Sequence, residues 1–336
     1  MSRQQVLPGL SAADYQRHAV HAPDCHWVER NCYVDVIIEM LHALGLEPLA
    51  ALGVTAAIDF EGDNFTFMKP NHEDLRVLYG VDIQEMNVWL PLLEHARHHL
   101  AEGKFISTEA DSFWLPDTSG TDYQRNHVKS TIVLADLDEG AKRLGYFHNA
   151  GYFELEGEDF DQLFRVGVPR DPTFLPLFAE LVRVDRMVHR PSPELAQMAF
   201  ARLGVYLDRR PATNPVRRFQ ARFEQELPRL QELGLAHYHA WAFATTRQLG
   251  AAAELLSMHV KWLADAGSRP ELAPAAASFL QVSALCKTFI LKAARAVNSK
   301  KPFDASPLFD EMATAWESGM AVLDRAVATA STGVPA

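Results

Sequence analysis

The stretch Asn31-Cys32-Tyr33-Val34-Asp35, followed directly by VIIEMLHALG at 36–45, sets the expectation for the first part of the chain. Its apolar residues recur at the spacing of one helix face: Val36, Ile37, Met40, Leu41 and Leu44. Asn31 is a typical N-cap and Gly45 a typical helix stop, so the pattern predicts a helix that begins at Cys32. Unpaired backbone N–H groups in a first turn favour the thiolate form of a cysteine. A cysteine can also simply pack there, so its partners decide whether it is a nucleophile.

Length and composition favour two well-packed domains. The chain has 336 residues, of which 48% are hydrophobic and 22% are charged, as in globular proteins. No apolar run approaches the roughly 20 residues that a membrane span needs, and the N-terminus lacks a basic-then-apolar signal pattern. Three cysteines do not make a disulfide framework. We therefore expect a cytoplasmic protein with reduced thiols.

Charge is distributed unevenly along the chain. The net charge is −11, and residues 1–170 hold 27 acidic and 13 basic residues, which leaves the second half slightly basic. This balance argues against nucleic acid as the main partner. One basic cluster stands out in the second half: Arg209, Arg210, Arg217, Arg218, Arg222 and Arg229. The cluster is either a solvated face or a docking patch for an acidic partner.

The order of local patterns predicts an arm at 1–24, an α+β domain at 25–168 and an all-α helical bundle at 169–336. Strands are predicted at 64–68, 81–88, 105–110, 127–135 and 145–149. Helices are predicted at 46–58, 71–79, 91–102 and 158–164. Strand signals nearly vanish after residue 171, and helical segments follow at 173–188, 193–207, 216–233, 235–266, 270–297 and 307–327.

A nucleophilic cysteine needs a base, and the base needs a third group that orients it. His127 is the best candidate base because it opens a strand directly after the long connection at 111–126. A hairpin that turns near Asp138 would place Asn149 opposite His127 on the same sheet face. A register error of one residue would bring His148 there instead. The residues thus predict Cys32, His127 and Asn149 as the catalytic set.

The order of these residues resembles that of papain-like cysteine peptidases and acyltransferases. More closely, ERNCYVD at 29–35, RNHVKSTI at 125–132 and GYFHNAGYFELEGEDFDQLF at 145–164 resemble the butirosin biosynthesis protein H type of acyltransferase. They also resemble an uncharacterised family associated with stand-alone aminoacyl carrier-protein ligases. The resemblance implies a papain-like fold for the first domain and acyl transfer from a carrier-protein thioester to an amine.

Two positions depart from the patterns that the resemblance implies. Papain-type enzymes have Gln six residues before the nucleophile, where this chain has His26, and the butirosin-type relatives more often have Asp where this chain has Asn149. The residues that would stabilise the oxyanion are therefore not identified by the pattern alone. Its candidate donors are the backbone N–H of Cys32 and the side chains of His26 and Asn31. Trp114, in the long connection, is a further candidate substrate contact.

We expect an aminoacyl or peptidyl transferase in which Cys32 is acylated by a carrier-protein thioester. The carrier protein would be acidic and would bring its own phosphopantetheine, so we expect no cofactor bound by the chain itself. Two alternatives stay open: a peptidase or amidase that uses the same residues, and a non-catalytic adaptor that binds carrier proteins. Zinc binding by His21, Cys25, His26 and Cys32 is disfavoured because their spacing matches no compact zinc knuckle, so we expect no metal.

Overall fold

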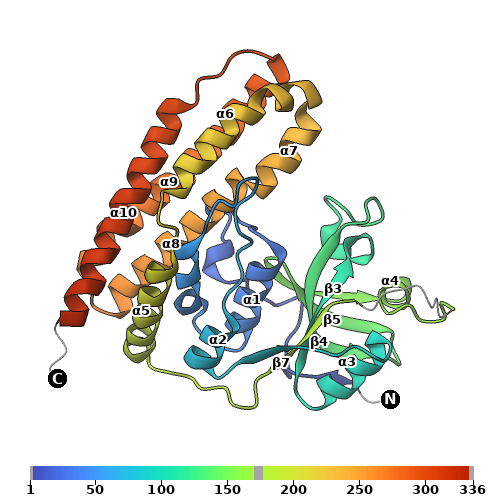
Figure 1. The fold of residues 1–336 in the computed structure, drawn as a ribbon. Coiled ribbons are helices and arrows are strands. Elements are labelled where there is room, and N and C mark those ends of the chain that lie inside the picture. Colours follow the sequence, from blue (N-terminus) through green and yellow to red (C-terminus); the bar gives the residue numbers. More distant parts are fainter. Residues whose placement is uncertain (1–2, 170–176, 333–336) are drawn as a thin grey trace. The chain divides into compact units, whose positions relative to one another are not determined.

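The computed structural model describes residues 3–169 and 177–332 (Figure 1). The chain divides into two compact units that are interleaved in sequence. The first unit consists of Met1–Ala22, Asn31–Pro48 and Pro70–His189, and the second of Pro23–Arg30, Leu49–Lys69 and Arg190–Ala336. Each unit is described by itself below.

An antiparallel sheet forms the centre of the first unit (Figure 1). Its strands are β1 (Gln4–Gln5), β2 (Asp82–Glu85), β3 (Phe105–Asp111), β4 (Lys129–Asp138), β5 (Arg143–His148), β6 (Gly151–Glu156) and β7 (Ala179–Arg183). The spatial order is β2-β7-β3-β4-β5-β6, and β1 pairs with β4. The sheet order therefore puts β7, late in the sequence, between β2 and β3.

Helices cover both faces of this sheet. Helix α1 (Cys32–Ala43) packs against β4, β5 and β6. On the opposite face, Ile132 and Leu134 of β4 join one apolar core with Ala96 and Leu100 of α3 (Leu92–Ala101). Helix α4 (Glu158–Leu163) contributes to the same core. Because side chains alternate along a strand, neighbouring residues of β4 point to opposite faces of the sheet.

Local signals placed several elements of the first unit correctly. Helix α2 (His72–Tyr79) begins after Asn71, whose side chain accepts the N–H of Glu73, and it ends at Gly80 with a positive φ of 71°.

Two other elements of the chain differ from the prediction. The predicted helix at 46–58 is instead the 3₁₀-helix Pro48–Ala57. The predicted strand at 64–68 forms only one bridge, between Phe60 and Phe65.

The predicted helix at 173–188 is wrong where the structure describes it, because residues Ala179–Arg183 form strand β7; residues 170–176 lie outside the described part of the chain. The local sequence AELVR is rich in good helix formers. Pairing with β2 on one side and β3 on the other overrides this preference. The sheet thus continues beyond residue 168.

The second unit is helical. Its α-helices are α5 (Ser192–Arg209), α6 (Pro215–Leu233), α7 (Leu235–Ala244), α8 (Thr246–Ala266), α9 (Ala273–Ser299) and α10 (Ser306–Thr332). The predicted helix at 235–266 is broken at Thr245, whose ψ of −92° is not helical. Aromatic rings fill the core, where Phe219 and Phe223 each contact Phe289 and Phe309. The described part of the chain is therefore α+β, with an antiparallel sheet, ten α-helices and an all-helical C-terminal part.

One helical stretch in the described residues, Pro270–Ser299, is long and apolar enough to span a membrane by length and composition alone. Core helices pass the same test. Phe279 and Phe289 of this stretch are fully buried in the helical unit, as packing of a core helix requires.

Candidate active site

Cys32 is the first residue of α1, as predicted. Asn31 caps the helix: its side-chain oxygen accepts the N–H groups of Tyr33 at 3.1 Å and Val34 at 2.9 Å. The half-buried thiol of Cys32 lies 3.5 Å from Oγ1 of Thr131 on β4 and can donate a hydrogen bond to it. The local cap thus fixes the helix start, and the sheet fixes the direction of the thiol.

His127 is oriented by Asp111, a residue that the sequence did not single out. Nδ1 of His127 lies 2.6 Å from Oδ2 of Asp111, and the imidazole stacks on Phe113 with ring centroids 4.4 Å apart. The other Asp111 oxygen accepts the N–H of Phe113. His127 is 67% exposed, so its Nε2 edge faces solvent. The imidazole is therefore held at one nitrogen and accessible at the other.

Asn149 does not lie opposite His127. Ile132 pairs with His148, and Asn149 is in the tight turn between β5 and β6, with a positive φ of 43°. The predicted hairpin register is wrong by four residues because Asp138 is still paired, with Arg143. The turn follows at 139–142 and is closed when Oδ1 of Asp138 accepts the N–H of Ala141.

The three predicted catalytic side chains do not contact one another. Among the described residues, no hydrogen bond joins Cys32 to His127 or Asn149. Glu109 pairs with Thr131 and Asp111 with Lys129, so Asp111 lies on the sheet face of Thr131 and Cys32, and Asp111 holds His127 there. The four residues from His127 to Thr131 span up to about 13 Å. Lys129 lies between them and pairs with Glu109 at 3.0 Å. The thiol and the imidazole are thus on one face but out of direct reach.

A buried polar cluster lies next to Cys32 in the chain. The hydroxyl of Tyr33 donates to Oε2 of Glu180 at 2.8 Å, and Nε2 of His72 lies 2.7 Å from the same hydroxyl. Ser107 also donates to Glu180. Burial, together with the Glu180 charge, raises the pKa of Tyr33 well above its usual range, so the phenol stays neutral. Sequence patterns do not predict this cluster, because they favour a helix for the segment that contains Glu180.

The other candidate substrate contacts have partners of their own. The backbone N–H of His26 donates to Oε1 of Glu254 at 2.6 Å, and its Nδ1 lies 3.2 Å from the Ser283 hydroxyl; all three residues belong to the second unit. Trp114 belongs to the first unit and packs edge-on against Phe113 at 4.7 Å. Of these two, only Trp114 shares a unit with Cys32.

The four residues considered for zinc also have separate environments. Both imidazole nitrogens of His21 face carboxylates, with Asp35 at 3.1 Å and Glu39 in a shorter contact. Cys25 and His26 belong to the second unit, whereas His21 and Cys32 belong to the first. The ring of His21 therefore has no nitrogen left for a metal ion.

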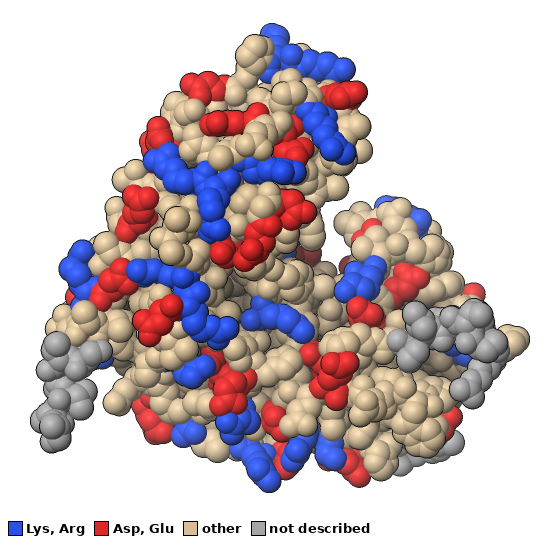
Figure 2. Space-filling view, in the orientation of Figure 1, with Lys and Arg blue, Asp and Glu red and all other residues tan. Residues whose placement is uncertain are grey.

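Carboxylates neutralise most of the predicted docking arginines. Arg210 forms two contacts with Asp324, at 2.6 and 2.9 Å. Three further pairs are equally direct: Arg217 with Asp310, Arg218 with Asp59, and Arg222 with Glu226. Arg209 lies over the ring of Tyr206 instead. Basic and acidic side chains alternate on the visible helical surface in Figure 2. This pattern fits a solvated face better than a basic patch.

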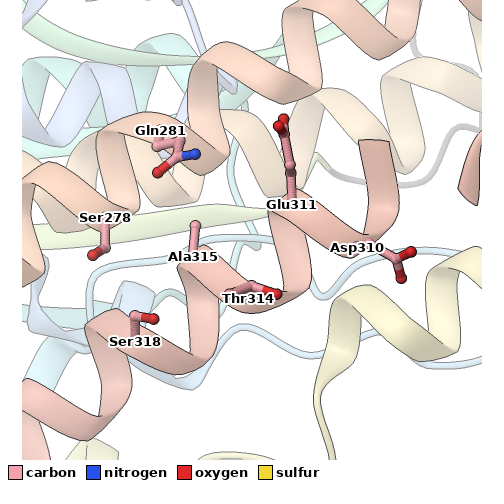
Figure 3. Close-up of a pocket in the computed structure, with 7 residues that line it drawn as sticks. All are labelled: Ser278, Gln281, Asp310, Glu311, Thr314, Ala315 and Ser318. Carbon is pink, nitrogen blue, oxygen red and sulfur yellow. The ribbon is translucent and has the colours of Figure 1, made fainter. Parts of the chain in front are cut away.

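A polar pocket of about 330 Å³ lies between α9 and α10 (Figure 3). Ser278 and Gln281 of α9 face Glu311, Thr314 and Ser318 of α10 across it. Its lining offers hydroxyl, amide and carboxylate groups but no thiol or imidazole. In the described structure, no hydrogen bond joins a hydroxyl of this lining to one of its carboxylates, so no nucleophile and base are in contact there.

Comparison with known proteins identifies both parts of the chain. Residues 16–184 match the family model described as the DUF1839 N-terminal domain, and residues 192–325 match the DUF1839 C-terminal domain. No curated protein matches the chain. The two matches together cover most of the sequence, and their descriptions state no activity.

Proposed function

The chain belongs to the DUF1839 family, and from its residues we propose that it is a cysteine-dependent acyltransferase. It would move an aminoacyl or peptidyl group from a carrier-protein thioester to an amine. One observation carries the proposal: a half-buried thiol at the first residue of α1 contacts Thr131, on the sheet face where the β3–β4 register also puts Asp111, the partner of His127. The packing of α1 on an antiparallel sheet supports a papain-like architecture for the first unit.

The start of α1 suits an acyl-enzyme. The cap occupies the N–H groups of Tyr33 and Val34. Among the described residues, the N–H of Cys32 itself has no hydrogen-bond acceptor. This N–H would donate to the oxyanion that forms when the Cys32 sulfur attacks the thioester carbonyl. The positive end of the helix stabilises negative charge at the same place.

His127 would carry the proton, and Asp111 takes the orienting role predicted for Asn149. Asp111 holds Nδ1, so Nε2 faces outward, where it would accept the proton of the attacking amine. The thiolate of Cys32 would attack the thioester and release the phosphopantetheine thiolate, a step that needs no direct contact between Cys32 and His127.

Carrier-protein delivery fits a thiol that is half-buried at a helix start, because phosphopantetheine is a long, narrow arm. The arginine cluster lends this delivery little support. Four of its guanidinium groups have carboxylate partners, so little net charge is left for an acidic carrier protein. We therefore propose the donor class without assigning its docking to these arginines.

The direct test is mass spectrometry of the intact chain after incubation with an aminoacyl N-acetylcysteamine thioester. We expect one acyl adduct, which peptide mapping places on Cys32 and which an added amine removes as the amide. Cys32→Ala should lose the adduct. Cys25→Ala is the matched control, since Cys25 is also half-buried, and it should keep the adduct.

The same experiment separates the alternatives. An adduct that is released as the free acid at the same rate with or without amine would identify a peptidase or amidase. A folded chain that forms no adduct with any aminoacyl thioester would favour a non-catalytic adaptor and overturn the proposal.

A further inference from the structure

A hydrogen-bonded serine, histidine and aspartate lie on the sheet face opposite Cys32. Oγ of Ser130 lies 2.6 Å from Nε2 of His148, and Nδ1 of His148 lies 2.6 Å from Oδ2 of Asp117. Ser130 comes from β4, His148 from the end of β5, and Asp117 from the 3₁₀-helix Pro116–Thr118. Because Thr131 faces Cys32, its neighbour Ser130 faces the other way.

The two imidazole nitrogens are arranged as acyl chemistry requires. A carboxylate can only accept, so Nδ1 of His148 carries the proton that is shared with Asp117. Nε2 is then free to accept the hydrogen of the Ser130 hydroxyl. This is the order of contacts of a nucleophile, a base and an orienting acid. Asp117 is fixed in turn by the hydroxyl of Tyr146, which donates to its other oxygen at 2.5 Å.

Tyr146 is a reliable donor to Asp117. Burial, together with the charge of Asp117, raises the pKa of Tyr146 well above its usual range. The phenol therefore stays protonated and keeps its hydrogen bond to Asp117, which holds the carboxylate beside His148.

The Ser130, His148 and Asp117 contacts are not needed to anchor the segment that carries Asp117. The hydroxyl of Thr118 donates to the carbonyls of Ser112 and Leu115, and the hydroxyl of Ser112 donates to the carbonyl of Val128. These bonds hold the segment on the sheet without any titratable group. A purely structural role would therefore leave the charged contacts redundant.

We propose that Ser130 is a second nucleophile, independent of Cys32, that hydrolyses small activated acyl esters. The hydroxyl proton passes to Nε2 of His148 as the Ser130 oxygen bonds to the acyl carbon, and the alcohol leaves with that proton. Water then gives its proton to His148 and attacks the acyl-serine, which releases the acid and restores the hydroxyl. Ser130 is 8% exposed and pairs with the small residue Ala110, so its narrow access restricts the proposed substrates to small acyl groups.

The test uses a fluorophosphonate probe and p-nitrophenyl acetate on the full chain. We expect the probe on Ser130 by peptide mapping, and acetate release that Ser130→Ala abolishes. Asp117→Asn should lower the labelling rate about 100-fold, since correct proton transfer contributes that much. Ser107→Ala is the matched control, because it removes a buried hydroxyl from the neighbouring strand β3 that donates to Glu180 and does not contact His148 or Asp117.

His148→Gln adds a readout that a structural role would not change. In this variant the labelling rate should be low and should lose the pH dependence that general-base catalysis by an imidazole gives. The variants must show unchanged circular dichroism before they are compared. A folded native chain whose Ser130 stays unlabelled, or whose labelling survives Asp117→Asn unchanged, would overturn the inference without affecting the Cys32 adduct.

Discussion

Nδ1 of His127 lies 2.6 Å from Oδ2 of Asp111, and the strand pairing explains why. Asp111, the last residue of β3, pairs with Lys129, the first residue of β4. The Asp111 side chain therefore lies beside His127, two positions before Lys129. The partner of the candidate base thus comes from the strand before the long connection and not from the strand after it. This relationship changes which variants should matter.

Asp111→Asn should lower acyl transfer about 10-fold or more, because the amide can present N–H to Nδ1 and favour the wrong tautomer of His127. The rate of aminoacyl transfer from a small thioester measures this effect. Asp122→Asn, in the same connection, is the control, since Asp122 contacts Asn126 and not His127. Equal rates in native and Asp111→Asn proteins would remove Asp111 from the site.

Asn149→Gly should leave acyl transfer and stability near those of the native protein. Asn149 occupies a left-handed turn position with a φ of 43°, where glycine is at ease. Asn149→Val should destabilise by about 1–2 kcal/mol, because a β-branched side chain is strained there. Urea unfolding and the transfer rate check the two effects. A large loss of activity in a stable Asn149→Gly protein would restore Asn149 as a catalytic residue.

The three cysteines should differ in how readily iodoacetamide alkylates them in the folded chain. Cys286 is fully buried, and burial raises the pKa of its thiol well above the usual range. Iodoacetamide should therefore modify Cys32 and Cys25 in the folded chain and reach Cys286 only in urea, as peptide mapping would show. Rapid modification of Cys286 in native buffer would contradict its buried placement.

The buried cluster around His21 should give the first unit a pH-dependent stability. Burial alone lowers the pKa of His21, but hydrogen bonds with Asp35 and Glu39 outweigh it and raise the pKa above 6.5. Burial likewise raises the pKa of Glu39, but the His21 contacts outweigh it, so the net shift is downward from 4.5. The His21 contribution is complete below about pH 6.5 and is lost as pH rises through its raised pKa. The Glu39 contribution is complete above about pH 4.5 and is lost as pH falls.

The cluster should therefore stabilise most at about pH 4.5–6.5, which urea unfolding at pH 5.5 and 8.5 would test. His21→Ala removes the imidazole that the buried carboxylates of Asp35 and Glu39 share and should cost about 3 kcal/mol at pH 5.5. His98→Ala, at a 67% exposed histidine, is the control and should cost little. A native protein equally stable at both pH values, with no loss in His21→Ala, would exclude charge on His21.

The sequence by itself determined the elements whose signals are local. The cap at Asn31, the apolar stripe of α1 and the start of α2 after Asn71 involve residues within a few positions of one another, so periodicity and capping sufficed to find them. The same holds for most helices of the second unit. The position of Cys32 at a helix start was therefore readable, and the structure confirms it.

Only the tertiary structure decided which distant residues meet. Asp111 reaches His127 across the connection at 112–126, and the buried contacts of Glu180 come from a strand whose own residues favour a helix. Strand register depends on where each turn closes. Asp138 is still paired, so the turn closes after it; Asn149 is therefore out of reach of His127, and His148 contacts Ser130. Local propensity does not predict such pairings, because they are stabilised by burial and hydrogen bonds that form only when the sheet assembles.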